Sequence, residues 1–343
     1  MNILGIDIGT NLIKAVEVKK EKGSTQLLKY SYSSAFNEPL LSELSIDTDN
    51  FAKKLREFIS YSSFSSENVI ASLPESHVFT RVIELPKISK KEIEKAVFWE
   101  AEKYLPISIE DVNLNFQILP SDTTLDKEEK TEVLLIAAPK ALVNNFVKIL
   151  EKTGLIPLAL EPESMAIARS ICYNEESFPE TLIINIGSES TTISILVNKY
   201  IRFTRNISTG GTTLIRAISQ DIGLEMDQAE EYMKSYGLDE SKMDGKISSS
   251  MEPVFNVILN EVRKSIAYFE TKKSPSRVKR VVLCGGISTI PGILIYVAQY
   301  LNVEVQKANP WLKITVGDKY SKKELDELGP MFAASVGLVL KEV

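Results

Sequence analysis

One short pattern occurs twice in this chain, near its start and again near its middle. Residues 3–10 read Ile-Leu-Gly-Ile-Asp-Ile-Gly-Thr, and residues 182–188 read Leu-Ile-Ile-Asn-Ile-Gly-Ser. A second β-rich run follows each copy, at residues 12–18 and 191–197. This repeat at half-chain spacing predicts a duplicated α/β fold with a cleft between two similar halves. The alternative is two unrelated core strands that end in ordinary glycine turns.

Each copy ends in a turn that could hold phosphate. Two strands joined by a glycine-containing turn expose backbone N–H groups, and such a nest binds anionic oxygens. The first turn is expected to contact the ligand through Gly9, Thr10 and Asn11, with Lys14 on the next strand reaching a phosphate. Asp7 precedes this turn, and a carboxylate at that place would hold a hydrated Mg²⁺ ion.

The second turn is expected to face the same ligand. It offers Gly187 and Ser188, and Asn185 stands where the first copy has Asp7, so its contact with the metal would run through water. Two hairpins of this kind could grip one polyphosphate from both sides.

Three further segments could line the cleft, although each alone is more often structural. Glu161 lies at a strand-to-helix turn, where a carboxylate could order an attacking water. A helix start favours an anion through its free N–H groups, and a glycine pair lets a ligand approach the backbone closely. These two segments are Gly210, Gly211 and Thr212, and Gly285, Gly286 and Ile287.

The composition is that of an ordinary globular protein of about two domains, with a net charge of −6 that argues against a nucleic-acid binder. A single histidine, His77, argues against a histidine metal site and against a Ser-His-Asp triad, and two cysteines fit a reducing cytosol. No leader peptide is expected, because the chain opens directly into a strand. Residues 281–303 carry no charge, but their glycines and prolines predict strand, turn and helix and no membrane span.

Residues 76–154 form an expected insertion of β-α-β-β-α order. Its first strand is expected at residues 78–85, and Ser89 with Glu92 forms a capping box for the next helix. A charged hairpin loop is expected at 121–130. In the second half, residues 239–252 are expected to be a polar, mobile stretch before a long helix at 253–272, and the final helix is expected to cover residues 331–340.

The five segments, in this order, resemble the actin-like ATPase superfamily. Its two phosphate motifs, adenosine motif and two connecting motifs are similar to residues 5–18, 183–197, 281–292, 160–169 and 330–338. The resemblance implies a duplicated actin-like (ribonuclease H-like) ATPase fold that binds ATP and Mg²⁺, with Asp7 and Glu161 as catalytic residues. The implied domains are domain I at 1–75 and 155–180, the insertion at 76–154, domain II at 181–330, and a returning helix at 331–343.

A narrower resemblance is to the PilM family of type IV pilus assembly proteins. Residues 98–107, Phe-Trp-Glu-Ala-Glu-Lys-Tyr-Leu-Pro-Ile, carry it most specifically. It implies a cytoplasmic protein that docks the N-terminal cytoplasmic peptide of PilN, lies at the inner membrane through that partner, and serves twitching motility. The insertion is the expected docking place, through the strand at 78–85 and the apolar residues of the helix after it that its own sheet leaves uncovered.

Two departures from the superfamily pattern argue against fast hydrolysis. Asn185 replaces the second motif's Asp, which removes a charge near the metal. Glu230 matches a ribose-contacting Glu-x-x-Lys, but Met233 stands at the Lys position and Lys234 follows it, about 100° round the helix. The predicted function is therefore a nucleotide-binding docking protein with weak or no ATP hydrolysis. The alternatives are an active ATPase or sugar kinase, and an FtsA-like filament-forming scaffold that associates with itself.

Overall fold

The computed structural model describes residues 1–34, 47–87, 90–120, 130–172, 178–272 and 276–342. The chain divides into two compact units. Unit 1 contains Met1–Ile167, Tyr200–Thr204 and Ala334–Val343, and unit 2 contains Ala168–Lys199 and Arg205–Ala333. The Ser89 cap and most of the expected loop at 121–130 lie outside the described residues.

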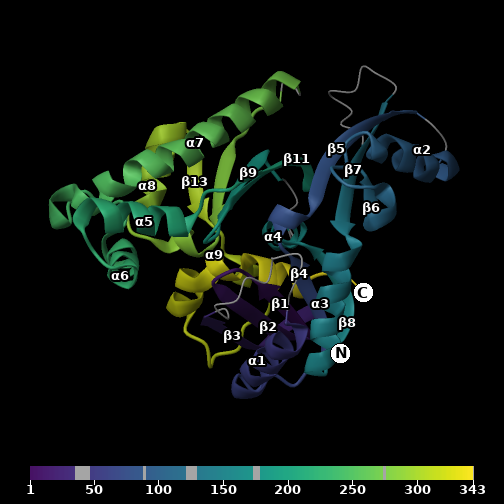
Figure 1. Cartoon of the computed structure of the whole chain (residues 1–343), viewed down its shortest axis with the longest axis horizontal. Coiled ribbons are helices and arrows are strands. Elements are labelled where there is room, and N and C mark those ends of the chain that lie inside the picture. The colour runs from purple at the N-terminus through teal and green to yellow at the C-terminus, as the bar shows by residue number, and fades with distance from the viewer. Residues whose placement is uncertain (35–46, 88–89, 121–129, 173–177, 273–275, 343) are drawn as a thin grey trace. The chain divides into compact units, whose positions relative to one another are not determined.

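Unit 1 is built on a five-stranded sheet of order β3-β2-β1-β4-β8 (Figure 1). Its strands are β1 (Asn2–Ile8), β2 (Leu12–Glu21), β3 (Ser24–Ser34), β4 (Asn68–Leu73) and β8 (Ile156–Pro162). The first three form an antiparallel meander, and β4 and β8 join it in parallel. One face buries alternate apolar residues, such as Leu4 and Ile6, against helices α1 (Thr48–Tyr61) and α3 (Lys140–Thr153).

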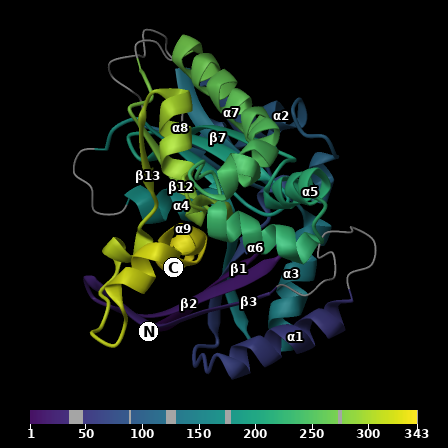
Figure 2. The same ribbon diagram turned by 90° about the vertical axis from the view of Figure 1, so that its left-hand side faces the viewer.

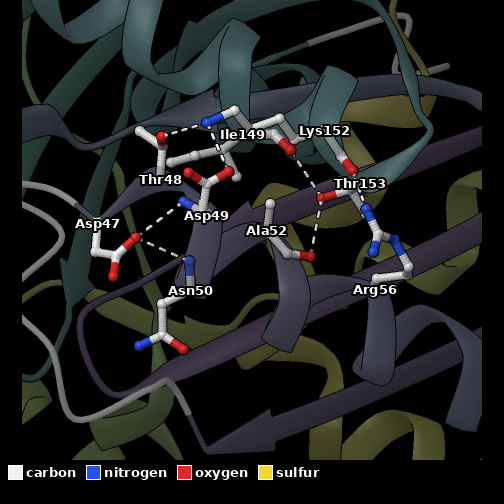
Figure 3. A network of polar contacts seen from close by, with 9 residues as sticks. All are labelled: Asp47, Thr48, Asp49, Asn50, Ala52, Arg56, Ile149, Lys152 and Thr153. Atoms are coloured by element: carbon white, nitrogen blue, oxygen red, sulfur yellow. Dashed lines mark hydrogen bonds and ion pairs between the residues drawn. The ribbon is translucent and has the colours of Figure 1, made fainter.

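Polar contacts hold α1 against α3 at one end (Figure 3). Asp47 caps α1 by accepting hydrogen bonds from the N–H groups at positions 49 and 50. Lys152 on α3 forms an ion pair with Asp49 of α1 at 2.8 Å, and the Thr153 hydroxyl of α3 donates to the Ala52 carbonyl of α1 at 3.4 Å. The insertion's second helix is therefore fastened to the core of the first sheet.

Helix α9 (Lys322–Val339) covers the other face of this sheet with its last turns. A Cβ atom on Gly5 would lie 2.5 Å from the Ser335 carbonyl oxygen, so only glycine allows this approach. Gly337 packs equally closely on the backbone of Ala166 in α4 (Glu163–Cys172). The Ser335 hydroxyl also donates to the Lys14 carbonyl at 3.2 Å.

The inserted strands form a separate three-stranded antiparallel sheet of order β5-β7-β6. They are β5 (Phe79–Pro86), β6 (Val112–Ile118) and β7 (Lys130–Pro139). Helix α2 (Lys90–Glu102) packs on this sheet (Figure 1) through Ile93 and Val97, which meet Ile83 and Leu85 of β5. The predicted β-α-β-β-α order is confirmed, and β5 is an edge strand.

Unit 2 repeats the sheet of unit 1. Its order is β11-β10-β9-β12-β13, from β9 (Thr181–Ile186), β10 (Thr191–Val197), β11 (Tyr200–Ile207), β12 (Arg280–Cys284) and β13 (Glu304–Lys307). The edge strand β11 is shared, because its residues Tyr200–Thr204 belong to unit 1. As in unit 1, the first strand pairs antiparallel with the second and parallel with a later strand. The duplication predicted from the repeated pattern is therefore present in the topology.

The helices of unit 2 are α5 (Gly211–Ile222), α6 (Met226–Tyr236), α7 (Lys246–Lys272) and α8 (Ile293–Leu301). Helices α7 and α8 lie side by side, and α8 lies along β13 (Figure 2). Short 3₁₀ turns occur at Glu75–His77, Ile109–Asp111, Met243–Gly245, Gly286–Thr289 and Pro310–Lys313. Among the described residues, none of the helices has the length and apolar character needed to cross a bilayer.

Two expectations about helix starts are wrong. The long helix expected from residue 253 begins earlier, because α7 starts at Lys246 and buries Ile247 and Met251 before it passes through Pro253. Helix α9 begins at Lys322 and not at residue 331, because Leu325 is buried and the helix continues through Pro330.

Candidate functional site

The parallel strands of unit 1 bring acidic residues to one edge of the sheet. The Ser72 hydroxyl, on β4, donates a 2.7 Å hydrogen bond to Asp7 on β1. Ser72 is also paired in register with Glu161 of β8. Paired residues on neighbouring strands point to the same face, so Asp7, Ser72 and Glu161 share the face that α9 covers.

Asp7 is buried and forms an ion pair with Lys14, its partner across β1 and β2, at 2.5 Å. Burial alone lowers the pKa of Lys14, but the nearby charges of Asp7 and Glu163 outweigh burial and raise that pKa. The ammonium group is therefore held charged at the end of β1, among carboxylates. A phosphate group that reached this place would compete with Asp7 for Lys14.

The two predicted phosphate turns have the same geometry. The Gly9 N–H donates to the Leu12 carbonyl at 3.0 Å, and the Gly187 N–H donates to the Ser190 carbonyl at 2.9 Å. A Cβ atom at either glycine would crowd that same carbonyl. Thr10 and Asn11 are exposed at the tip of the first turn.

In unit 2 the start of α5 lies directly on the second turn. The Gly211 N–H donates to the Gly187 carbonyl at 2.9 Å, and the Thr212 N–H donates to the Ser188 carbonyl at 2.8 Å. The expectation of free N–H groups at positions 211 and 212 is therefore wrong. Gly210 is enclosed, because its Cβ would lie 2.6 Å from the Ser188 carbonyl oxygen.

The glycine pair after β12 comes close to the same turn. Gly285 has φ of +85°, and a Cβ there would lie 2.2 Å from the Ile186 carbonyl oxygen and 2.9 Å from the Asn185 side-chain oxygen. A Cβ on Gly286, in contrast, would meet no atom within 4 Å, so a ligand could approach the backbone there. Ile287 contacts Gly211. Unit 2 therefore gathers the residues predicted at Asn185, Gly187, Ser188, Gly210, Gly211, Gly285, Gly286 and Ile287.

The expected ribose pair lies on the outer side of α6. Glu230 and Lys234 form an exposed ion pair at 2.7 Å, and Met233, at the position of the family's Lys, is buried. The end of α6 also contacts the segment after the glycine pair, because the Leu238 N–H donates to the Pro291 carbonyl at 2.8 Å.

Sequence reasoning missed three neighbours of the acidic residues in unit 1. Ser72 had a weak signal, as the one polar residue at the end of an apolar strand. Lys341 had none, yet its ammonium lies 3.0 Å from the buried Glu161 carboxylate. Glu75 is buried, which raises its pKa, and it accepts hydrogen bonds from the Ser164 N–H and hydroxyl at the start of α4.

These groups fit a magnesium–nucleotide ligand in kind. Unit 1 offers the Asp7 carboxylate and the Lys14 ammonium, and unit 2 offers an open backbone at Gly286. Within the described residues, no three or more His, Cys, Asp or Glu side chains are grouped as metal ligands. Mg²⁺ usually keeps several waters and takes its remaining ligands from one or two carboxylates and from phosphate.

Comparison with known proteins places this geometry in a family. The family model described as "Type IV pilus assembly protein PilM" matches residues 5–343. A solved structure titled "PilM-PilN type IV pilus biogenesis complex" is 29% identical, covers 98% of this chain and 97% of that chain, and superposes with a TM-score of 0.84.

More distant relatives share the fold. The cell division protein FtsA of Enterococcus hirae is 22% identical over 88% of this chain and 77% of its own. MreB5 of Spiroplasma citri, solved bound to AMPPNP, is 13% identical over 99% of this chain and 95% of that chain, with a TM-score of 0.55. With its duplicated sheets, its paired glycine turns and a family match over nearly its whole length, this chain belongs to the type IV pilus assembly protein PilM family and has the actin-like fold.

Proposed function

We propose that this protein docks the N-terminal cytoplasmic peptide of a PilN-like membrane protein, binds ATP with Mg²⁺, and hydrolyses it slowly or not at all. The observation that carries the proposal is the likeness, over 98% of the chain, to PilM in a PilM–PilN complex. Docking would bring the chain to the inner membrane from the cytoplasm through its partner. It would there serve pilus functions such as twitching motility.

The edge strand β5 is the proposed docking place. Its inner edge pairs with β7, and within the described residues no strand pairs with its outer edge. Thr80 on β5 has a buried hydroxyl oxygen with no hydrogen-bond partner in the described part of the chain. An extended peptide that adds a strand at this edge would meet unpaired backbone groups and gain main-chain hydrogen bonds.

Apolar side chains flank this edge from both cores of unit 1. Val78, just before β5, packs in the core of the first sheet, and Ile83 and Leu85 pack in the core beneath α2. A peptide along β5 would therefore run past both cores, which favours a tail with apolar residues at alternate positions. Phe98 and Trp99 leave the other side of α2 apolar and exposed, at 44% and 67%.

The nucleotide part of the proposal is supported by the two equivalent glycine turns. Asp7, Glu161, Gly9, Thr10, Asn11, Lys14, Thr212, Glu230 and Lys234 stay proposed contacts, together with the gathered residues of unit 2. Bound Mg²⁺ would supply charge that stabilises the transferred phosphoryl group. Asn185 brings no charge to this place, so slow hydrolysis is expected.

A binding experiment tests the docking site. A fluorescent peptide with the N-terminal sequence of a PilN-like protein is titrated with the purified chain, and anisotropy is measured. Val82 on β5 and Gln117 on β6 flank the same β7 residue, Leu134, on opposite edges of one sheet. Val82→Lys should weaken binding at least tenfold, because a charged side chain at that edge opposes an apolar tail.

Gln117→Lys is the matched control and should bind as the wild type does. Absence of binding by the wild type would refute the partner. Equal weakening by both substitutions would refute the β5 edge as the docking place.

A further inference from the structure

Glu161 and Lys341 form an ion pair within unit 1, and what we infer from it rests on the nucleotide function proposed above. Glu161 lies at the carboxyl end of β8, next to Ser72, which in turn binds Asp7. Its side chain is buried, and one of its carboxylate oxygens, Oε2, lies 3.0 Å from the Lys341 ammonium nitrogen.

Lys341 is fixed by its backbone as well as by its side chain. Its carbonyl accepts a hydrogen bond from the Lys20 ammonium, and its N–H donates to the Leu338 carbonyl at 3.1 Å. Residues 334–340 carry it there because they pack on β1 at Gly5. The ammonium group therefore reaches Glu161 from a firmly placed backbone.

This contact changes what Glu161 can do. A carboxylate that orders an attacking water must accept a hydrogen bond from that water. An ammonium at hydrogen-bond distance already occupies Oε2 and balances the negative charge. The Glu161 side chain is 7% exposed and the Lys341 side chain 33%, so solvent screens this ion pair only in part and it restrains the Glu161 side chain.

We propose that Lys341 is a positioning residue that restrains Glu161 and so slows hydrolysis of bound nucleotide. In that reaction a water oxygen bonds to the γ-phosphorus, the bond from this phosphorus to the ADP oxygen breaks, and the water's proton ends on the released phosphate. Release of Lys341 lets the Glu161 Oε2 atom accept a hydrogen bond from that water. While Lys341 stays paired with Glu161, the protein would hold its nucleotide unhydrolysed for long periods. Hydrolysis would speed up only when residues 340–342 move away.

Single-turnover hydrolysis by Lys341→Met tests this inference. We expect roughly a tenfold rise in rate over the wild type, a part of the roughly 10²–10⁴-fold that a fully positioned acid or base contributes. The Lys341→Met/Glu161→Gln double variant should lose the rise, and Lys341→Arg, which keeps the positive charge, should stay at the wild-type rate. Lys323→Met, which removes an exposed lysine in the first turn of α9, should also leave the rate unchanged.

A second measurement is made without nucleotide. Melting temperatures are measured for the wild type, Lys341→Met, Glu161→Gln and the double variant. They should show coupling between positions 161 and 341, since each partner stabilises the other. A residue with only a structural role would show this coupling without any rise in hydrolysis.

The outcomes separate this inference from the proposed function. If calorimetry shows no nucleotide binding by the wild type, this inference and the nucleotide part of the proposed function both fail. If nucleotide binds but Lys341→Met hydrolyses it no faster, or the double variant is as fast as Lys341→Met, the restraint by Lys341 is refuted and the proposed function stands.

Discussion

A buried ion pair joins β11 to the inserted sheet. Arg202 on β11 donates to the Glu132 carboxylate on β7 and to the Pro120 carbonyl. The two charged side chains are only 4% and 10% exposed. Replacing Arg202 by Met removes the guanidinium and leaves the Glu132 carboxylate buried beside an apolar side chain.

The size of the effect follows from burial. Breaking a buried pair by removing one partner destabilises a protein by about 3–5 kcal/mol, because the other charge loses its compensation. The Arg202 Nε is buried with no hydrogen-bond partner in the described residues, so removing it recovers a part of the lost stability. We therefore expect a destabilisation of about 3 kcal/mol, the lower end of this range. The Arg202→Met/Glu132→Leu double variant should recover most of the stability, since both charges are gone.

The same sheet supplies a matched control. Lys130 and Glu84 form an ion pair at 3.3 Å with side chains 48% and 31% exposed. Lys130→Met should therefore cost less than about 1 kcal/mol. Both variants are unfolded in urea and followed by circular dichroism and tryptophan fluorescence. If Arg202→Met lowers the free energy of unfolding no more than Lys130→Met does, burial does not govern these pairs as argued.

Three further predictions concern the candidate site. Asp7→Ala should weaken Mg²⁺-dependent ATP binding, measured by calorimetry, and unchanged affinity would remove Asp7 from the metal site. Asn185→Asp should raise the turnover of ATP, because it restores a charge near the metal; a wild-type turnover of about 1–100 per second, typical of kinases, would refute slow hydrolysis. Gly286→Ala should lower nucleotide affinity without changing the melting temperature, because the new Cβ enters open space. Gly285→Ala should lower the melting temperature, because its Cβ would meet the Ile186 carbonyl oxygen. Equal melting temperatures for these two variants would contradict the described geometry.

The repeated parts of the fold could be predicted from local pattern. Short contiguous segments of sequence determine the two glycine turns and the strands beside them, and the duplication follows from comparing residues 3–10 with 182–188. The core face of α2 was also predictable, since Ile93 and Val97 follow helical spacing. The family resemblance, confirmed over residues 5–343, added the order of the motifs.

Other features depend on contacts between distant segments and leave no local pattern. Lys341 and Glu161 are 180 positions apart in the chain, and a lone lysine near the end of a helix carries no sign of its partner. Strand β13 was missed because Glu304–Lys307 does not alternate clearly between buried and exposed residues at the edge of its sheet. The start of α7 was missed because its buried Ile247 and Met251 stand among serines and before Pro253.

The packing of α9 on β1 has a consequence for how this protein is made. The Ser335 hydroxyl and the Lys14 carbonyl, which meet across this face, are 321 positions apart in the chain. At ribosomal rates of about 5–20 residues per second, the face of β1 that carries Gly5 stays uncovered for tens of seconds after its synthesis. Contacts of such separation also fold slowly. During synthesis this face of the first sheet is therefore a surface that a chaperone could bind. It can be covered only after α9 has left the ribosome.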